Sequence, residues 1–130
     1  MLNTEDFLRR ILGPVRSDIR PLVLAVDVTA ELLYQEQCRE SDIHVSRDVY
    51  ANVAKQLNKK ERTVAKAVQR LTSVLWDAFD QELVMQVIGK KLAYPPEPRA
   101  MLFYLAFYLY HEEAYHSADN RNPFEPMVSF

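Results

Sequence analysis

The chain has 130 residues, of which 48% are hydrophobic and 26% charged, and its net charge is −2 at pH 7. This length suits one domain with a single core, and the composition excludes a wholly disordered chain. The near-neutral charge argues against a protein that coats nucleic acid without sequence preference. Cys38 is the single cysteine, and no basic signal-peptide segment opens the chain, so we expect a cytoplasmic protein. The most apolar run, residues 100–110, is shorter than the roughly 20 residues that span a bilayer, so we expect no membrane partner.

The N-terminal third of the chain predicts two helices, and strand-like alternation of polar and apolar residues is absent. Thr4, followed by two acids, predicts the cap of a short helix that ends near Leu12. Ser17 predicts the start of a long helix that accommodates Pro21 near its first turn. This long helix has apolar stripes on two sides, which predicts a central position with other helices on both sides. One stripe contains Ile19, Leu22, Val23, Val26, Ala30 and Leu33, and the other contains Leu24, Val28 and Leu32.

A polar break at residues 35–42 precedes a short helix, a tight turn and a longer helix within residues 49–76. We expect Ser46, with Arg47 and Asp48 after it, to cap the short helix. Asn58 tolerates the left-handed backbone that a tight turn needs. The short helix has one apolar stripe, formed by Val49, Val53 and Leu57. This spacing predicts a helix-turn-helix.

The longer helix of this pair has two chemically distinct faces. Its apolar positions, Val64, Val68, Leu71 and Leu75, share a narrow arc at 100° per residue. The opposite arc contains Arg62, Lys66, Gln69 and Ser73, and is flanked by Thr63 and Arg70. Residues 55–70 include six basic side chains and one acid, a local charge of +5, whereas the rest of the chain sums to −7. A basic island on an acidic body predicts one surface for a polyanion.

A helix with this basic face predicts sequence-specific binding of duplex DNA, with its first two turns in a major groove. The residues expected to face bases are Arg62, Thr63, Lys66 and Gln69. The residues expected to contact the DNA backbone are Lys55, Lys59, Lys60 and Arg70. The alternative interpretation is an ordinary amphipathic helical hairpin with a solvated Lys/Arg face, because loose matches to this motif are common.

The C-terminal part predicts a short helix capped by Asp80 that ends at Gly89, a proline-rich connector, and a last helix from about Glu97 to Tyr115. This last helix is apolar on almost every side, so it is either buried in one core or shared with a partner. We predict a homodimer through part of this helix, because aromatic residues dominate interfaces. The expected dimer contacts are Tyr104, Phe107 and Tyr108.

These elements together predict an all-α fold, a compact bundle of about six helices that contains the helix-turn-helix. Residues 1–116 form one helical domain in this prediction, and residues 117–130 form an extended C-terminal tail. We expect order in the tail only where Phe124 or Phe130 docks.

Catalytic and metal-binding patterns give no positive signal in this chain. His111 and His116 are five residues apart, about 140° around a helix, whereas helical metal ligands are three or four residues apart. His44 stands alone, and no nucleophile with a neighbouring base or glycine-rich phosphate loop is visible. We therefore predict neither a metal site nor a cofactor, and a protein that is not an enzyme. A small enzyme or ligand sensor is the least favoured interpretation.

Residues 49–58, Val-Tyr-Ala-Asn-Val-Ala-Lys-Gln-Leu-Asn, resemble the stretch Leu-Tyr-Pro-Asp-Ile-Ala-Lys-Lys-Phe-Asn of a known family. That family is the C-terminal DNA-binding effector domain of stage 0 sporulation protein A, a sporulation response regulator. Val64, Ala67, Val68 and Trp76 also match, and the similarity covers roughly residues 8–116. The resemblance implies a six-helix domain that binds duplex DNA at tandem sites, with protomers paired through the last helix.

The chain departs from this family in its base-reading positions and in its length. Thr63, Ala65 and Lys66 stand where the family has the base-reading Arg, Glu and Arg. The chain therefore either reads a different DNA site or has kept only the attraction to phosphate. We also expect no receiver domain, so phosphorylation of an aspartate is not the expected switch. The competing hypothesis is a protein-interaction module that modulates a related full-length regulator through residues 101–110.

Overall fold

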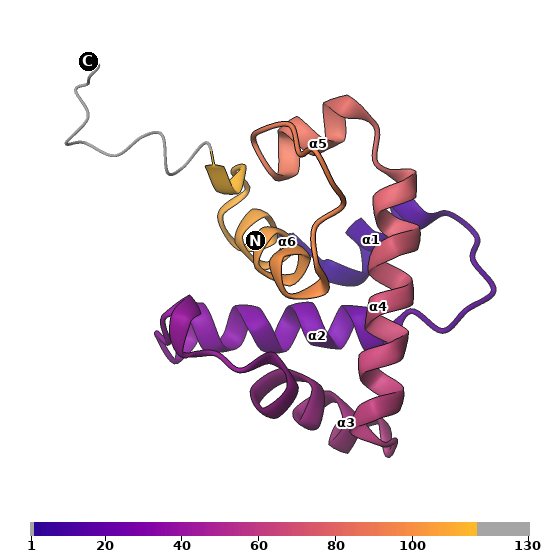
Figure 1. The fold of residues 1–130 in the computed structure, drawn as a ribbon, viewed down its shortest axis with the longest axis vertical. Helices are drawn as coiled ribbons and strands as arrows, with labels where there is room; N and C mark the ends of the chain where they lie inside the picture. The colour runs from indigo at the N-terminus through magenta and orange to yellow at the C-terminus, as the bar shows by residue number, and fades with distance from the viewer. Residues whose placement is uncertain (1, 117–130) are drawn as a thin grey trace.

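A computed structural model describes residues 2–116 of the chain (Figure 1). All regular secondary structure in this part is helical, so the predicted all-α fold is confirmed, with six α-helices. Three short π or 3₁₀ segments, η1 Glu31–Gln35, η2 Glu40–Asp42 and η3 Val45–Tyr50, complete it. The α-helices are α1 Thr4–Leu12, α2 Arg20–Ala30, α3 Ala51–Leu57, α4 Glu61–Ala78, α5 Gln81–Val87 and α6 Pro98–His111. In residues 2–116, no helix is long and apolar enough to cross a membrane. The predicted tail, with Phe124 and Phe130, lies outside the described residues.

Helix α2 occupies the centre of the bundle, as its two apolar stripes predict. It packs against α1, α3, α4 and α6, and α4 runs crosswise past its N-terminal end (Figure 1). Leu22, Ala25 and Val26 of α2 are almost completely buried. The helix begins at Arg20, three residues later than predicted from Ser17, because the Asp18 carboxylate accepts a 3.0 Å hydrogen bond from the Arg20 amide and forms a turn first.

Two predicted helix caps are not formed by the expected residues. Helix α1 is capped by Asn3, whose side-chain oxygen accepts a 2.9 Å hydrogen bond from the amide of Asp6. The expected cap, Thr4, is buried and donates its hydroxyl to Asp27 of α2 at 2.6 Å, so a tertiary contact has recruited it. Before α3, the segment η3 begins after His44 without a side-chain cap, so Ser46 does not have the expected capping role. Instead the Asp48 carboxylate reaches back and accepts a 2.8 Å hydrogen bond from the His44 amide.

Helix α6 lies against α2 and its middle is buried within the monomer (Figure 1). Its most enclosed side chains are those of Met101, Leu102, Leu105, Ala106 and Leu109. The helix ends at His111, four residues earlier than predicted, because Glu112 adopts a left-handed backbone with φ of 59°. The Glu112 amide then donates a 2.7 Å hydrogen bond to the Tyr108 carbonyl and closes the last turn. Most of the apolar surface of α6 therefore belongs to the monomer core.

The first turn of α6 is tied to the segment before α3 by one arginine. Arg99 donates 2.7 Å hydrogen bonds from its two terminal nitrogens to the carbonyls of Ile43 and Glu40. Its guanidinium also lies 4.7 Å from the centre of the Phe103 ring. These contacts satisfy carbonyls in the irregular segment that precedes the α3–α4 pair, and so help to position that pair.

Candidate nucleic-acid interface

Helices α3 and α4 are joined by a tight turn of three residues, 58–60. Asn58 has φ of 54° and ψ of 50°, which confirms the predicted left-handed backbone at this position. The Lys59 amide donates a 2.9 Å hydrogen bond to the Ala54 carbonyl, and the Asn58 amide reaches the Lys55 carbonyl at 3.4 Å. This is the Schellman arrangement, which ends α3 and sends the chain directly into α4.

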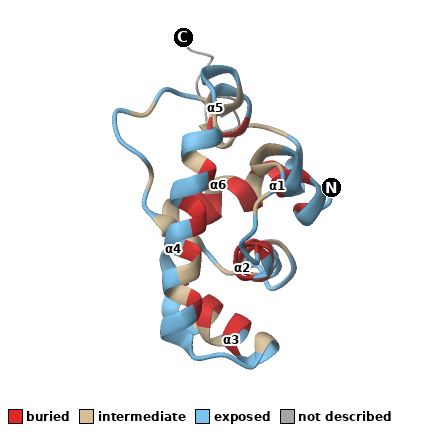
Figure 2. Cartoon of the chain, turned by 90° about the vertical axis from the view of Figure 1, so that its right-hand side faces the viewer, coloured by how far each residue is buried: buried red, intermediate tan, exposed pale blue. Residues whose placement is uncertain are grey.

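Helix α4 separates its apolar and polar faces as the sequence predicts. The side chains of Val64, Val68, Leu71 and Leu75 are buried against the rest of the bundle. Those of Arg62, Lys66, Gln69 and Ser73 are exposed. Figure 2 shows the exposed residues as a band along the outer side of α4, with the buried ones turned inward. The face predicted to read bases is therefore open to solvent over the first turns of the helix.

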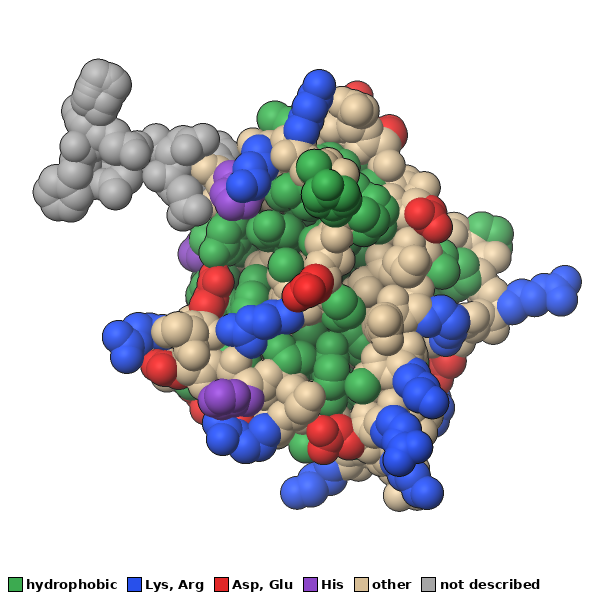
Figure 3. Space-filling model, in the orientation of Figure 1, with side chains coloured by type: hydrophobic (Ala, Val, Ile, Leu, Met, Phe, Trp, Pro, Cys, Tyr) green, Lys and Arg blue, Asp and Glu red, His purple; other side chains and the backbone are tan. Residues whose placement is uncertain are grey.

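Six cations, which we call the basic ridge, follow the α3–α4 pair. They are Lys55, Lys59, Lys60, Arg62, Lys66 and Arg70, and all six are exposed. Figure 3 shows Lys and Arg side chains gathered over the α3–α4 turn. The ion pairs among residues 2–116 are Arg9–Glu5, Arg20–Asp18, Arg39–Asp42 and Arg47–Asp48, none of which uses a ridge cation. No carboxylate in the described part of the chain is thus paired with the ridge.

Two acids near the ridge have other roles. Glu61 is exposed in the first turn of α4, where a carboxylate stabilises the positive end of the helix dipole. Asp18 is engaged by Arg20, whose side-chain hydrogen bonds lower the pKa of that carboxyl from 3.8 to about 2, with a small contribution from Lys59. Because Asp18 already has a cation, it leaves most of the positive charge of the ridge available.

The structure adds a loop to this surface that the sequence did not single out. Arg70 of α4 donates a 3.0 Å hydrogen bond to the hydroxyl of Ser17, in the loop between α1 and α2. Arg16, the residue before Ser17 in this loop, is exposed as well. Ser17 and Arg70 are 53 positions apart, so no local pattern in the sequence could have brought them together.

Ala65 is the position on α4 where the chain differs most from the resembling family. Thr63 is exposed beside Arg62, whereas Ala65 is half-buried on the flank of α4. Ala65 offers only a methyl group at a position where the resembling family has a glutamate. The longer exposed side chains on this side of α4 are those of Arg62, Lys66 and Gln69, with the Thr63 hydroxyl beside Arg62.

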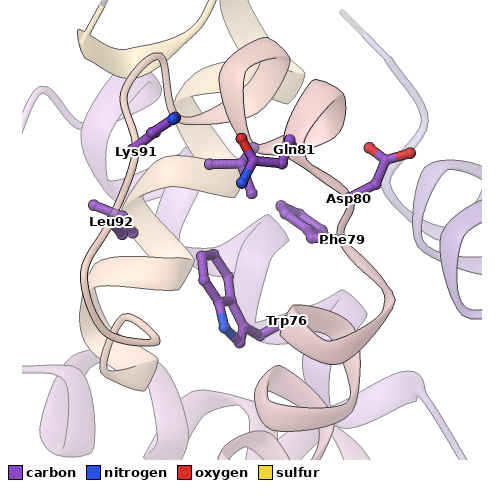
Figure 4. Close-up of a pocket in the computed structure, with 7 residues that line it drawn as sticks. Trp76, Phe79, Asp80, Gln81, Lys91 and Leu92 are labelled. Atoms are coloured by element: carbon purple, nitrogen blue, oxygen red, sulfur yellow. The ribbon is translucent and has the colours of Figure 1, made fainter.

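A pocket lies at the C-terminal end of α4, whereas the residues predicted to face DNA bases begin at its N-terminal end. Apolar side chains of Trp76, Phe79, Val84 and Leu92 and polar side chains of Asp80, Gln81 and Lys91 line it together. Figure 4 shows the Trp76 and Phe79 rings and the Leu92 side chain around the space. The Trp76 and Phe79 rings are 6.1 Å apart between centroids. The cavity measures about 210 Å³. It is large enough to hold a side chain of another segment or a small apolar group.

The three residues predicted at a dimer interface differ in exposure. Tyr108 is 7% exposed, its hydroxyl accepts a 2.6 Å hydrogen bond from Gln86, and its ring lies 5.4 Å from that of Phe7. Tyr108 therefore belongs to the monomer core, which corrects its expected role as a contact. Tyr104 and Phe107 are half-buried and retain surface that another protomer can reach. The homodimer stays a prediction that rests on these two side chains.

Within residues 2–116, no group of three or more His, Cys, Asp or Glu side chains is placed to hold a metal ion. No family model, curated protein or solved structure matches the chain. The resemblance to the sporulation effector domain therefore depends on residues 49–76, where it is strongest.

Proposed function

We propose that the protein binds duplex DNA sequence-specifically, using α3 and α4 as a helix-turn-helix, and that it acts in transcriptional regulation. One observation carries this proposal: all six cations of the basic ridge are exposed, and none is paired with a described carboxylate. When the phosphates of DNA bind such a surface, the counterions condensed on the DNA are released, and this release is a main driving force of DNA binding. The competing hairpin interpretation gives no reason for cations to accumulate on one side of an acidic protein.

The exposed residues of the α3–α4 pair form two groups with different roles in this proposal. Lys55, Lys59, Lys60 and Arg70 contact phosphates and set the register of the helix on the duplex. Arg62, Thr63, Lys66 and Gln69 face base edges in the major groove. Four phosphate contacts correspond to a slope of about −3 to −4 in log affinity against log salt concentration.

The connection to sporulation is supported by the resemblance of residues 49–76 alone. The same resemblance supports paired protomers on tandem DNA sites. In this arrangement the exposed parts of Tyr104 and Phe107 on α6 contact the second protomer, because aromatic side chains contribute strongly to interfaces.

A titration of the full chain with labelled duplex DNA, followed by fluorescence anisotropy at two salt concentrations, tests the proposal. We expect binding that weakens with salt, and enrichment of one sequence from a random pool. The charge-reversed variant Lys59→Glu/Lys60→Glu should lose binding. The variant Lys90→Glu/Lys91→Glu is its matched control, because it reverses another exposed pair of adjacent lysines outside the ridge. Absence of binding at low salt would exclude the proposal.

The alternative, a protein-interaction module that modulates a related regulator, is motivated by exposed aromatic surface on α6. Tyr110 is 38% exposed and stacks on Tyr34, with 4.4 Å between the ring centroids. Co-purification with a related full-length regulator, together with no affinity for duplex DNA, would favour this alternative. Binding of a selected duplex by the isolated protein would favour the DNA proposal.

A further inference from the structure

The pocket at the C-terminal end of α4 is large enough for one aromatic side chain, and two aromatic rings contribute to its lining. Its volume is about 210 Å³, and an engineered apolar cavity of about 150 Å³ is known to hold benzene. In Figure 4 the rings of Trp76 and Phe79 and the side chain of Leu92 border the space. Val84 lines it as well. Aromatic rings favour offset or edge contacts with other rings, which this lining offers from two directions.

One cation, Lys91, and one carboxylate, that of Asp80, belong to the lining of this pocket. Lys91 is exposed and takes part in none of the ion pairs among residues 2–116. The Asp80 carboxylate points away from the cavity in Figure 4 and accepts a 2.8 Å hydrogen bond from the Leu83 amide as the cap of α5. A segment that fits this site therefore has an aromatic residue next to an acidic one.

We propose that the occupant is the C-terminal segment of the same chain, with the ring of Phe124 in the pocket and the carboxylate of Glu125 beside Lys91. The segment Asn-Pro-Phe-Glu-Pro, residues 122–126, has the required order of aromatic and acidic residues. Pro123 and Pro126 restrict the backbone on both sides of this pair, which lowers the entropy lost on docking. This inference is independent of DNA binding, because the pocket lies outside the basic ridge.

The described chain stops close enough to the pocket for docking within one molecule. The amide of His116 donates a 3.0 Å hydrogen bond to the carbonyl of Ile88, directly after α5. Val84, in the wall of the pocket, is four residues before Ile88, or about 6 Å along a helix. Phe124 is eight positions after His116, a length of chain that can span up to about 28 Å. A tether of this length favours the pocket of its own chain over that of a second molecule at ordinary protein concentrations.

The single tryptophan of the chain makes this docking directly measurable. Trp76 lines the pocket, so its fluorescence reports whether a side chain covers it. In the full-length protein, Phe124→Ala should shift the emission to the red and increase quenching by acrylamide, because water reaches the indole. Phe130→Ala is the matched control and should leave both unchanged. An unchanged emission in Phe124→Ala, with the helical circular dichroism intact, would overturn the proposal.

A charge exchange between the two segments tests the ionic contact separately. Lys91→Glu and Glu125→Lys should each lower the ratio of docked to undocked tail, by up to about fivefold for an exposed pair. The double variant Lys91→Glu/Glu125→Lys should restore the emission of the natural protein, and Lys90→Glu should have no effect. Additive losses in the double variant would exclude the pairing. A Trp76 signal that depends on protein concentration would show docking between molecules and exclude the intramolecular proposal.

Discussion

Arg70 and Ser17 are joined by a 3.0 Å hydrogen bond, from the guanidinium Nη1 to the hydroxyl oxygen, although 53 positions separate them in the chain. This contact places the loop between α1 and α2 beside the middle of α4. The bond is exposed, so its contribution to folding stability is small. Its consequence is geometric, because it holds the guanidinium at the edge of the basic ridge next to the loop that also contains Arg16.

Replacing Arg70 by alanine should reduce the salt dependence of DNA binding. One phosphate contact contributes about 0.9 to the slope of log affinity against log salt, and Arg70→Ala should remove that amount for every duplex sequence. Ser17→Ala should keep the slope, because the cation remains. Arg39→Ala is the control, because Arg39 is also an exposed arginine but lies outside the basic ridge. It follows the C-terminal end of α2, whereas Ser17 precedes the N-terminal end of this helix. Equal slopes in Arg70→Ala and the natural protein would remove Arg70 from the interface.

Replacing Lys66 by alanine should separate base reading from phosphate attraction. If Lys66 contacts a base, Lys66→Ala weakens binding to the selected duplex by about 1–3 kcal/mol and binding to random duplex much less. Lys60→Ala should weaken both by a similar factor, because phosphates are the same in every sequence. Parallel titrations of the two duplexes by anisotropy check this, and an unchanged affinity for the selected site would exclude Lys66 from base contact.

The turn between α3 and α4 should be sensitive to the backbone preference of residue 58. Asn58 has a left-handed backbone, which disfavours most L-residues by about 1–2 kcal/mol. Asn58→Val should therefore lower the free energy of unfolding by about this amount in urea titrations. Asn58→Gly should change it by less than about 1 kcal/mol, because glycine adopts this backbone without strain but loses more entropy on folding. Equal stability of the two variants would contradict the strained geometry.

Asp18 should make folding stability depend on pH at the acid end. Arg20 lowers the pKa of Asp18 from 3.8 to about 2 through its side-chain hydrogen bonds. A lowered pKa means that this stabilisation is present above pH 3.8 and is lost as the pH falls towards 2. Asp18→Asn should approach the stability of the natural protein only as the pH falls below about 2, and should be slightly less stable above pH 4, because the pair is exposed. In NMR titrations, Arg20→Gln should return the pKa of Asp18 towards 3.8.

Arg99 should be important for stability although it is remote from the proposed DNA surface. Arg99→Ala removes the hydrogen bonds to the Ile43 and Glu40 carbonyls and the contact with the Phe103 ring. Hydrogen bonds from a charged donor contribute about 1.5–3 kcal/mol, so we expect a loss of this size in thermal or urea unfolding. Arg99→Lys should recover part of it, because an ammonium cannot form both bonds in the planar geometry of the guanidinium. A loss below about 0.5 kcal/mol would contradict this role.

Local signals predicted most of the elements, and they failed where a distant residue competed for the same atoms. The left-handed Asn58 and the Asp80 cap of α5 follow from short-range preferences and are present as predicted. The Thr4 cap is wrong because Asp27, 23 residues away, accepts the Thr4 hydroxyl. The expected dimer contact at Tyr108 is corrected for a similar reason, because Gln86 and Phe7 enclose this side chain. All three of these partners are too distant in sequence for helical periodicity to reveal them.

The sequence by itself determined the helical class, the α3–α4 pair and the side of α4 that stays in solvent. These properties depend on residues within a few positions of one another, where the 3.6-residue period and backbone preferences act. Only the tertiary structure decided that the α1–α2 loop borders the basic ridge, that Arg99 supports the segment before α3, and that Trp76 opens onto a pocket. These contacts join segments that are distant in sequence, and they depend on how the helices pack around α2.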